Sequence, residues 1–207
     1  HAPVIVWADA DLARFVPMLV GHKFRNAGQA CLAPTRFLVH QSIEREFSDR
    51  FVAAVQALKV GDGMNPAVQM GPMVNARRKA AMAPLLDNAL EHGADLACGG
   101  PMGGLGHFHE PTVLRNVPPT ARIMTEEPFG PLAPITEFNT LEEALTIANK
   151  VDASMIVTRA WKDQRGLVMK LAGQLLESRS QFLGVMLNRM RMTAGGYLRK
   201  NAEAMAE

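Results

Sequence analysis

The sequence predicts an α/β fold in which a mostly parallel sheet is flanked by helices. Short apolar runs alternate along the chain with stretches whose apolar residues recur at helical spacing. The strand-like runs, such as VIVW at residues 4–7 and FLGVML at 182–187, are continuously apolar, as in strands covered on both faces. The 207 residues, 48% hydrophobic and 20% charged, suffice for one good core or two small ones.

The first elements follow from local patterns. We expect a strand over residues 4–7, a helix capped by Asp9 or Asp11, a strand over 36–40 and a helix capped by Ser42. Apolar residues recur at helical spacing in the two helices, at Leu12, Phe15, Val16 and Leu19 in the first and at Phe47, Phe51, Val55 and Leu58 in the second.

Further along, Asn75 opens a helix over residues 76–92 that Gly93 ends. The glycine-rich stretch 99–109 is typical of a hairpin or surface loop. The segment TLEE at residues 140–143 fits a capping box that starts a helix.

His107 and His109, in the glycine-rich stretch, are spaced like metal ligands on a strand. No set of Cys, Asp or Glu ligands nearby completes a site, so we expect a solvated loop and no metal.

Composition restricts the function classes. A net charge of +2 gives no indication of a nucleic-acid partner, and no apolar run approaches the ~20 residues that span a bilayer. The start of the sequence does not resemble a signal peptide. The two cysteines, Cys31 and Cys98, lie in unlike settings, so we expect no disulfide and a reducing, cytoplasmic location.

Cys31 is the candidate nucleophile. It ends a GQAC turn at residues 28–31, between a helical pattern and a strand. A thiol is close to useful nucleophilicity at neutral pH, a tight turn can aim backbone N–H groups at an oxyanion, and Gly28 and Ala30 leave room for a substrate. The alternative is an inert core cysteine.

The stretch KFRNAGQAC at residues 23–31 resembles the active-site segment of the aldehyde dehydrogenase superfamily, where a Gly-Gln-x-Cys motif carries the catalytic thiol. EEPFGP at residues 126–131 resembles a second motif of that family, and weaker likenesses occur at 71–72 and 110–114. The resemblance covers residues 1–150 and implies a catalytic-domain fragment. The KFRN segment is similar to succinate-semialdehyde dehydrogenases.

The resemblance implies a reaction. The Cys31 thiolate would attack a small-molecule aldehyde, the thiohemiacetal would pass hydride to NAD or NADP, and water would release the acid. Glu127 would hold the nicotinamide ribose, with a solvated loop carboxylate as the alternative. Phe129 would pack beside the nicotinamide, with a core aromatic as the alternative.

Arg25 lies where succinate-semialdehyde dehydrogenases place an arginine, and a guanidinium can bind a second carboxylate on the substrate through two hydrogen bonds. The alternative is an arginine that pairs with a neighbouring surface carboxylate. Ala33, two residues after Cys31, excludes a vicinal cysteine pair. Homo-oligomers are expected of full-length relatives.

The resemblance also implies a truncated chain. In the family a Glu-Leu-Gly-Gly segment, whose Glu is the general base, directly precedes the strand that residues 2–6 resemble. Most of the dinucleotide-binding domain and an oxyanion-hole Asn also lie upstream. We therefore expect the isolated chain to be inactive.

Residues 151–207 differ in composition, with nine Lys or Arg against five Asp or Glu. The segments at 151–157 and 182–189 resemble the end of the ATPase domain of bacterial tyrosine kinases of polysaccharide export. We expect a βαβ unit, with strands over 153–159 and 182–188 around a helix over 163–178, followed by a basic tail. This resemblance implies that residues 151–207 have a different origin from residues 1–150, with a continuous, diverged aldehyde dehydrogenase chain as the alternative. The alternative function is accordingly a non-catalytic fragment or fusion that serves as a binding or assembly module.

Overall fold

The computed structural model describes residues 2–103, 106–140, 143, 153–159, 169, 172–173 and 181–188. The chain divides into two units, His1–Val151 and Asp152–Glu207, which are considered separately.

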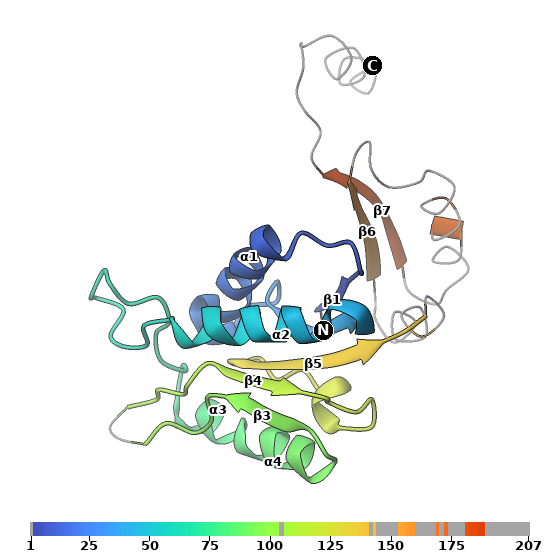
Figure 1. Cartoon of the computed structure of the whole chain (residues 1–207). Coiled ribbons are helices and arrows are strands. Elements are labelled where there is room, and N and C mark those ends of the chain that lie inside the picture. The colour runs from blue at the N-terminus through green and yellow to red at the C-terminus, as the bar shows by residue number, and fades with distance from the viewer. Residues whose placement is uncertain are drawn as a thin grey trace. The chain divides into compact units, whose positions relative to one another are not determined.

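The first unit is built on a five-stranded sheet in the order β1-β2-β5-β4-β3 (Figure 1). Its strands are β1 (Ala2–Val6), β2 (Pro34–His40), β3 (Asp95–Cys98), β4 (Thr112–Arg115) and β5 (Leu132–Phe138). The pairs β1–β2, β2–β5 and β4–β5 are parallel, and only β3 runs antiparallel, beside β4. The predicted α/β fold with a mostly parallel sheet is therefore confirmed.

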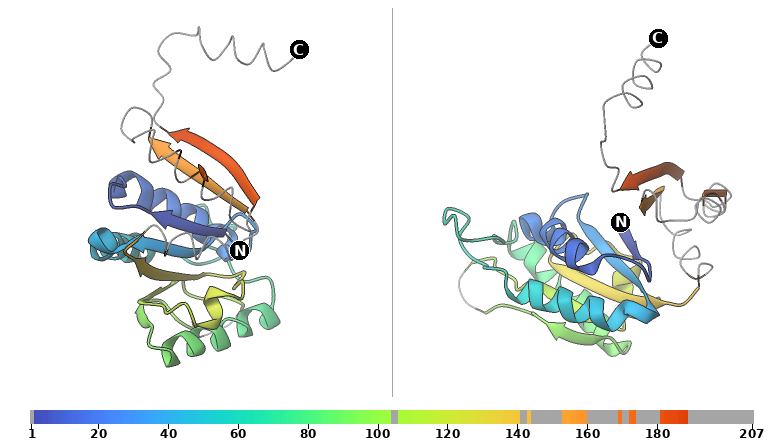
Figure 2. Two further views of the ribbon diagram at one scale, coloured as in Figure 1. Left: turned by 90° about the vertical axis from the view of Figure 1, so that its right-hand side faces the viewer. Right: turned by 45° about the horizontal axis from the view of Figure 1, so that its top comes forward.

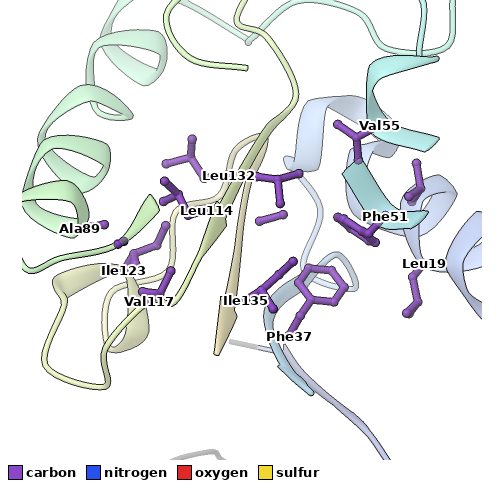
Figure 3. Close-up of a cluster of buried hydrophobic side chains, with 14 of the residues drawn as sticks. Leu19, Phe37, Phe51, Val55, Ala89, Leu114, Val117, Ile123, Leu132 and Ile135 are labelled. Atoms are coloured by element: carbon purple, nitrogen blue, oxygen red, sulfur yellow. The ribbon is translucent and has the colours of Figure 1, made fainter. Parts of the chain in front are cut away.

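Helices cover both faces of this sheet. Helices α1 (Leu12–Phe24) and α2 (Gln41–Gln56) lie side by side on one face (Figures 1 and 2). The other face is covered by α4 (Ala83–Glu91) and the short helix η2 (Arg122–Met124). Figure 3 shows Phe51 and Val55 of α2 on one side of the strands and Ala89 of α4 on the other. Two-sided cover explains the continuously apolar strands.

The helix caps agree in part with the sequence. The Asp11 side chain accepts a hydrogen bond from the Arg14 N–H at 3.3 Å, as predicted. Ser42 was expected to cap α2, but the cap is His40, whose Nδ1 accepts from the Ser42 N–H at 3.2 Å. The helix thus begins at Gln41, two residues earlier than a Ser42 cap would place it, because a ring nitrogen replaces the expected hydroxyl as the acceptor.

The single helix expected over 76–92 is two helices, α3 (Ala76–Ala80) and α4. Asn75 caps α3 as expected, accepting from the Arg78 N–H at 2.8 Å. The break precedes Pro84, which stands in the first turn of α4, where its missing N–H leaves no helical hydrogen bond unmade. Gly93 follows α4 with a φ of +94°, as a helix stop requires.

The glycine-rich stretch 99–109 connects the antiparallel strands β3 and β4, which confirms the hairpin. His109 contradicts the expected solvated loop, because it is only 3% exposed and its Nδ1 lies 2.7 Å from the Glu110 carbonyl oxygen. Burial lowers the pKa of this imidazole. The capping box is confirmed, since the Glu143 N–H donates to the Thr140 hydroxyl and the Glu143 carboxylate accepts from the Thr140 N–H.

In the second unit, β6 (Ala153–Arg159) and β7 (Gln181–Asn188) pair in parallel, as the predicted βαβ unit requires. Of the helix predicted between them, the structure describes residues 169, 172 and 173, which are helical. The basic tail after residue 188 and most of the helix expected after Thr140 lie outside the described residues.

Candidate active site

Parallel pairing brings the two sequence motifs to the same edge of the sheet. The turn with Cys31 directly precedes β2, and the loop with Glu127 and Phe129 directly precedes β5. Phe37 of β2 lies opposite Ile135 of β5, so Cys31 and Phe129 each stand six residues before a paired position. Adjacent parallel strands begin at the same edge, so the two loops are neighbours.

The turn before Cys31 has an unusual backbone. Asn26, Ala27 and Gly28 in the short helix η1 (Arg25–Gly28) have φ values of +53°, +52° and +69°. Their conformation is supported by side-chain bonds, since Asn26 Nδ2 donates to the Gln29 carbonyl and Gln29 Nε2 donates to the Asn26 carbonyl, both at 3.0 Å. Left-handed residues of this kind persist where their surroundings over-determine them.

Gln29 also ties this turn to a third segment. Its Oε1 accepts a hydrogen bond from the Val74 N–H at 2.9 Å, and its Nε2 lies 3.5 Å from the Pro72 carbonyl oxygen. The weak Gly71-Pro72 likeness noted in the sequence therefore lies beside the turn that leads to Cys31. The glutamine of the GQAC turn orders the backbone there.

The two motif loops touch at a pair of glycines. A Cβ atom placed on Gly28 would lie 2.3 Å from the Gly130 carbonyl oxygen. A Cβ on Gly130 would in turn lie 2.3 Å from the Met82 sulfur. Gly28 thus requires the absence of a side chain, because its Cβ would meet backbone atoms, whereas a Cβ on Gly130 would displace the end of the flexible Met82 side chain. The backbones of the two loops are in direct contact where Gly28 meets the Gly130 carbonyl.

Three cationic side chains from different elements hold the segment 124–130 by its carbonyl groups. Lys23 Nζ of α1 donates to the Gly130 carbonyl at 3.1 Å, and Arg36 Nη1 of β2 donates to the Met124 carbonyl at 2.9 Å. Arg78 of α3 donates to the Pro128 carbonyl. The loop that carries Glu127 is therefore fixed to the rest of the first unit through its main chain.

Lys23 is a functional candidate that the sequence analysis missed. It is 0% exposed, and burial lowers the pKa of its ammonium from 10.5 to about 7, while the charge of Glu127 acts in the opposite direction. A signal was present, because Lys23 lies four residues after Leu19 and seven after Val16 on the apolar face of α1. A lysine that continues an apolar stripe is buried unless its end reaches solvent.

The predicted site residues are placed as follows. Cys31 is exposed, Glu127 is exposed on the neighbouring loop, and Phe129 is 37% exposed with a φ of +40°. Phe129 is therefore not the core aromatic that was its alternative. Arg25, also exposed, begins η1 and lies on the same turn, six residues before Cys31.

Cys98, the other cysteine, ends β3 and is half-buried, and burial raises the pKa of its thiol. The described residues contain no group of three His, Cys, Asp or Glu side chains placed to hold a metal ion. None of the helices within the described ranges is long and apolar enough to cross a membrane.

The turn that carries Cys31 contacts the loop of Glu127 and Phe129 where Gly28 meets the Gly130 carbonyl. Comparison with known proteins identifies the class of protein to which this arrangement belongs. A profile of the Aldehyde dehydrogenase family matches residues 1–186. The chain therefore belongs to the aldehyde dehydrogenase family, and the resemblance seen in its motifs is confirmed.

Individual relatives agree. The chain is 52% identical over 150 residues to a putative 4-(hydroxymethyl)benzenesulfonate dehydrogenase of Comamonas testosteroni, covering 72% of this chain and 31% of the relative. It is 43% identical over 150 residues to the succinate-semialdehyde dehydrogenase of Paenarthrobacter nicotinovorans, and the match covers 72% of this chain and 33% of that enzyme. The structure of succinate-semialdehyde dehydrogenase from Burkholderia pseudomallei matches with a TM-score of 0.78 at 36% identity, over 93% of this chain and 39% of that one.

The chain thus spans about a third of the length of the curated relatives it matches. The family profile continues past residue 150 to residue 186, which favours one family chain up to that point. The separate origin of residues 151–207 and their kinase resemblance stay hypotheses.

Proposed function

We propose that this chain supplies the nucleophile and one cofactor-contacting loop of an NAD(P)-dependent aldehyde dehydrogenase. Cys31 acts as the nucleophile, and its thiolate attacks the aldehyde carbon to form a thiohemiacetal. The observation that carries the proposal is the alignment of the Cys31 turn with the Glu127 loop at one edge of the sheet. Relatives named for NADP(+), and solved relatives in complex with NAD+, support the cofactor class.

The residues present fit the nicotinamide half of a dinucleotide. Glu127 and Phe129 are both exposed, two residues apart, on a loop in backbone contact with the Cys31 turn. Glu127 is suited to accept hydrogen bonds from ribose hydroxyl groups, and the ring of Phe129 offers an apolar face. When bound, the dinucleotide accepts the hydride. The chain's own contribution is to hold the thiohemiacetal carbon beside that loop.

We further propose that the aldehyde carries an anionic group, which Arg25 binds. One relative is named for a benzenesulfonate compound and others for succinate semialdehyde, so an anion recurs in two otherwise different molecules. A guanidinium binds either a carboxylate or a sulfonate through paired N–H donors. Arg25 is exposed on the turn that leads to Cys31, where a substrate's far end can reach it.

The test is a chimaera. The segment of the Paenarthrobacter nicotinovorans enzyme that matches this chain over 150 residues is replaced by that part of this chain, and NAD(P)H formation from succinate semialdehyde is followed. We expect turnover, and loss of at least about 10³-fold in its Cys31→Ser variant. A folded chimaera without turnover, or one whose Cys31→Ser variant keeps it, would overturn the proposal.

The 207 residues expressed alone should show no turnover. The matched 150 residues make up only 31% of one such relative, and in the family the general base and an oxyanion donor lie in other segments. Loss of either contribution costs ~10²-fold or more. NAD(P)H production from succinate semialdehyde by the purified 207-residue chain would contradict this expectation.

A further inference from the structure

Lys23 has no role in the chemistry described so far, and yet its position is costly. The residue lies on the buried face of α1, is 0% exposed, and ends in a polar nitrogen that an apolar core does not favour. A side chain that only filled space would be apolar, as its neighbours Leu19 and Val20 are. The polar end of Lys23 therefore requires a reason.

The contacts of Lys23 supply one. Its Nζ donates to the Gly130 carbonyl at 3.1 Å, and this carbonyl is the group that packs against Gly28. The main chain of Lys23 reaches the same point, because its carbonyl oxygen would lie 3.3 Å from a Cβ on Gly28. Lys23 thus binds Gly130 through its side chain and has its main-chain carbonyl close to Gly28, where the two loops meet.

We propose that Lys23 is a positioning residue that fixes the loop of Glu127 and Phe129 against the turn of Cys31. The proposal rests on the proposed function, since it assigns importance to the distance between these two loops. Gly28 permits the close approach of the two backbones, and the Lys23 hydrogen bond favours it, because it gives the buried Gly130 carbonyl a donor. An unmade bond at a buried carbonyl is costly, so the loops separate when the donor is lost.

A lysine suits this task better than an arginine would. Its slender stem passes along the apolar face of α1, and its nitrogen is a single compact donor. Burial pushes the ammonium towards the neutral amine, while Glu127 favours the charged form. Both forms carry N–H groups, so the bond to the carbonyl survives the loss of a proton.

The experiment compares amide hydrogen exchange in the Lys23→Met variant and in a Leu85→Ala control. Leu85 is buried in α4, outside the sequence of both loops, and its truncation lowers stability while leaving the Lys23 hydrogen bond in place. After correction for global stability, Lys23→Met should speed exchange about tenfold in peptides over residues 24–31 and 126–133, and nowhere else. The Leu85→Ala control should leave both peptides unchanged. Lys23→Arg, which keeps a donor, should restore part of the protection.

If Lys23→Met exchanges like Leu85→Ala, or if Lys23→Arg rescues nothing, Lys23 only fills the core and the proposal is wrong. Should the methionine variant not fold, the wild-type chain provides the measurement. With lysine labelled by ¹⁵N and glycine by ¹³C at the carbonyl, the Gly130 carbonyl resonance should titrate together with Lys23 Nζ, and independent titration overturns the proposal. These readouts need no turnover, so they are distinct from the chimaera test of Cys31.

Discussion

Replacing Lys23 by methionine should change how the stability of the first unit depends on pH. Methionine is unbranched and of similar length, so it fills the site and removes only the titrating nitrogen. Burial lowers the pKa of Lys23 from 10.5 to about 7 in the folded chain. Between these two values the unfolded chain holds a proton that the folded chain has lost.

The sign and size follow from this difference. Where the unfolded state binds more protons, the free energy of unfolding rises with pH, by about 1.4 kcal/mol per pH unit for one group. Lys23 thus lowers the free energy of unfolding most below about pH 7, and this destabilisation becomes smaller as the pH rises towards 10.5. Between pH 7 and pH 9.5, wild type should gain about 3 kcal/mol relative to Lys23→Met.

Trp7 provides the assay. Its ring packs 5.1 Å from that of His40 and 5.4 Å from that of Phe138, so its fluorescence reports on the first unit once Trp161 is replaced by phenylalanine. Urea unfolding at four pH values from 7 to 9.5 gives the free energy of unfolding of each variant. The raised pKa of Cys98 affects both proteins equally and cancels in the comparison.

Leu85→Ala in the same background controls for lost stability, because its curve should lie below that of wild type and parallel to it. Parallel curves for wild type and Lys23→Met would refute the reasoning, since they would mean that Lys23 does not lose its proton in the folded chain.

Three further results are expected. Iodoacetamide should label Cys31 at least about tenfold faster than Cys98, because burial raises the pKa of the Cys98 thiol; peptide mass spectrometry decides, and faster labelling of Cys98 would exclude Cys31 as the activated thiol. Gly28→Ala should lower the free energy of unfolding by at least ~2 kcal/mol, since its φ is +69° and its Cβ would meet a carbonyl oxygen at 2.3 Å. Gly21→Ala is the control, because nothing lies within 4 Å of a Cβ at this helical position, and it should raise the free energy of unfolding by ~0.5–1 kcal/mol. Equal effects of the two substitutions would contradict the close contact of Gly28 with the Gly130 carbonyl. In the chimaera, Arg25→Met should raise KM for succinate semialdehyde about 10- to 100-fold and leave propanal unaffected; an equal loss for both aldehydes would argue against anion binding.

Local patterns were sufficient for β1, β2, β6 and β7 and for most caps, because these depend on a few neighbouring residues, whereas β3, β4 and β5 were not predicted. The break between α3 and α4 was missed, although Pro84 marks it, because the apolar spacing continues across it. His40 was missed as a cap since the usual capping residues are hydroxyl, carboxylate or amide side chains. In both cases two local signals competed, Pro84 with the apolar spacing and His40 with Ser42, and the prediction followed the wrong one.

The burial of Lys23 and of His109 was missed for a different reason. Both are polar residues that the fold buries, and their partners are main-chain carbonyls rather than residues with a recognisable side chain. A carbonyl acceptor leaves no mark in a sequence, because every residue has one. Gly28 and Gly130 could be recognised as motif glycines, but their mutual contact depends on the pairing of β2 with β5, across about 100 residues of chain.

The pairing of β1 extends the same geometry to a third strand. Ala2 lies opposite Pro34, and the Thr35 hydroxyl donates to the Ala2 carbonyl at 3.3 Å, so β1 begins at the edge where the Cys31 turn and the Glu127 loop meet. In a longer chain, the segment that leads into β1 would arrive there as well. The Glu-Leu-Gly-Gly segment that the family resemblance places before this strand would therefore reach the edge where Cys31 lies. Three parallel strands with one common edge would then bring together the proposed nucleophile, the proposed cofactor-contacting loop and the general base that the resemblance implies.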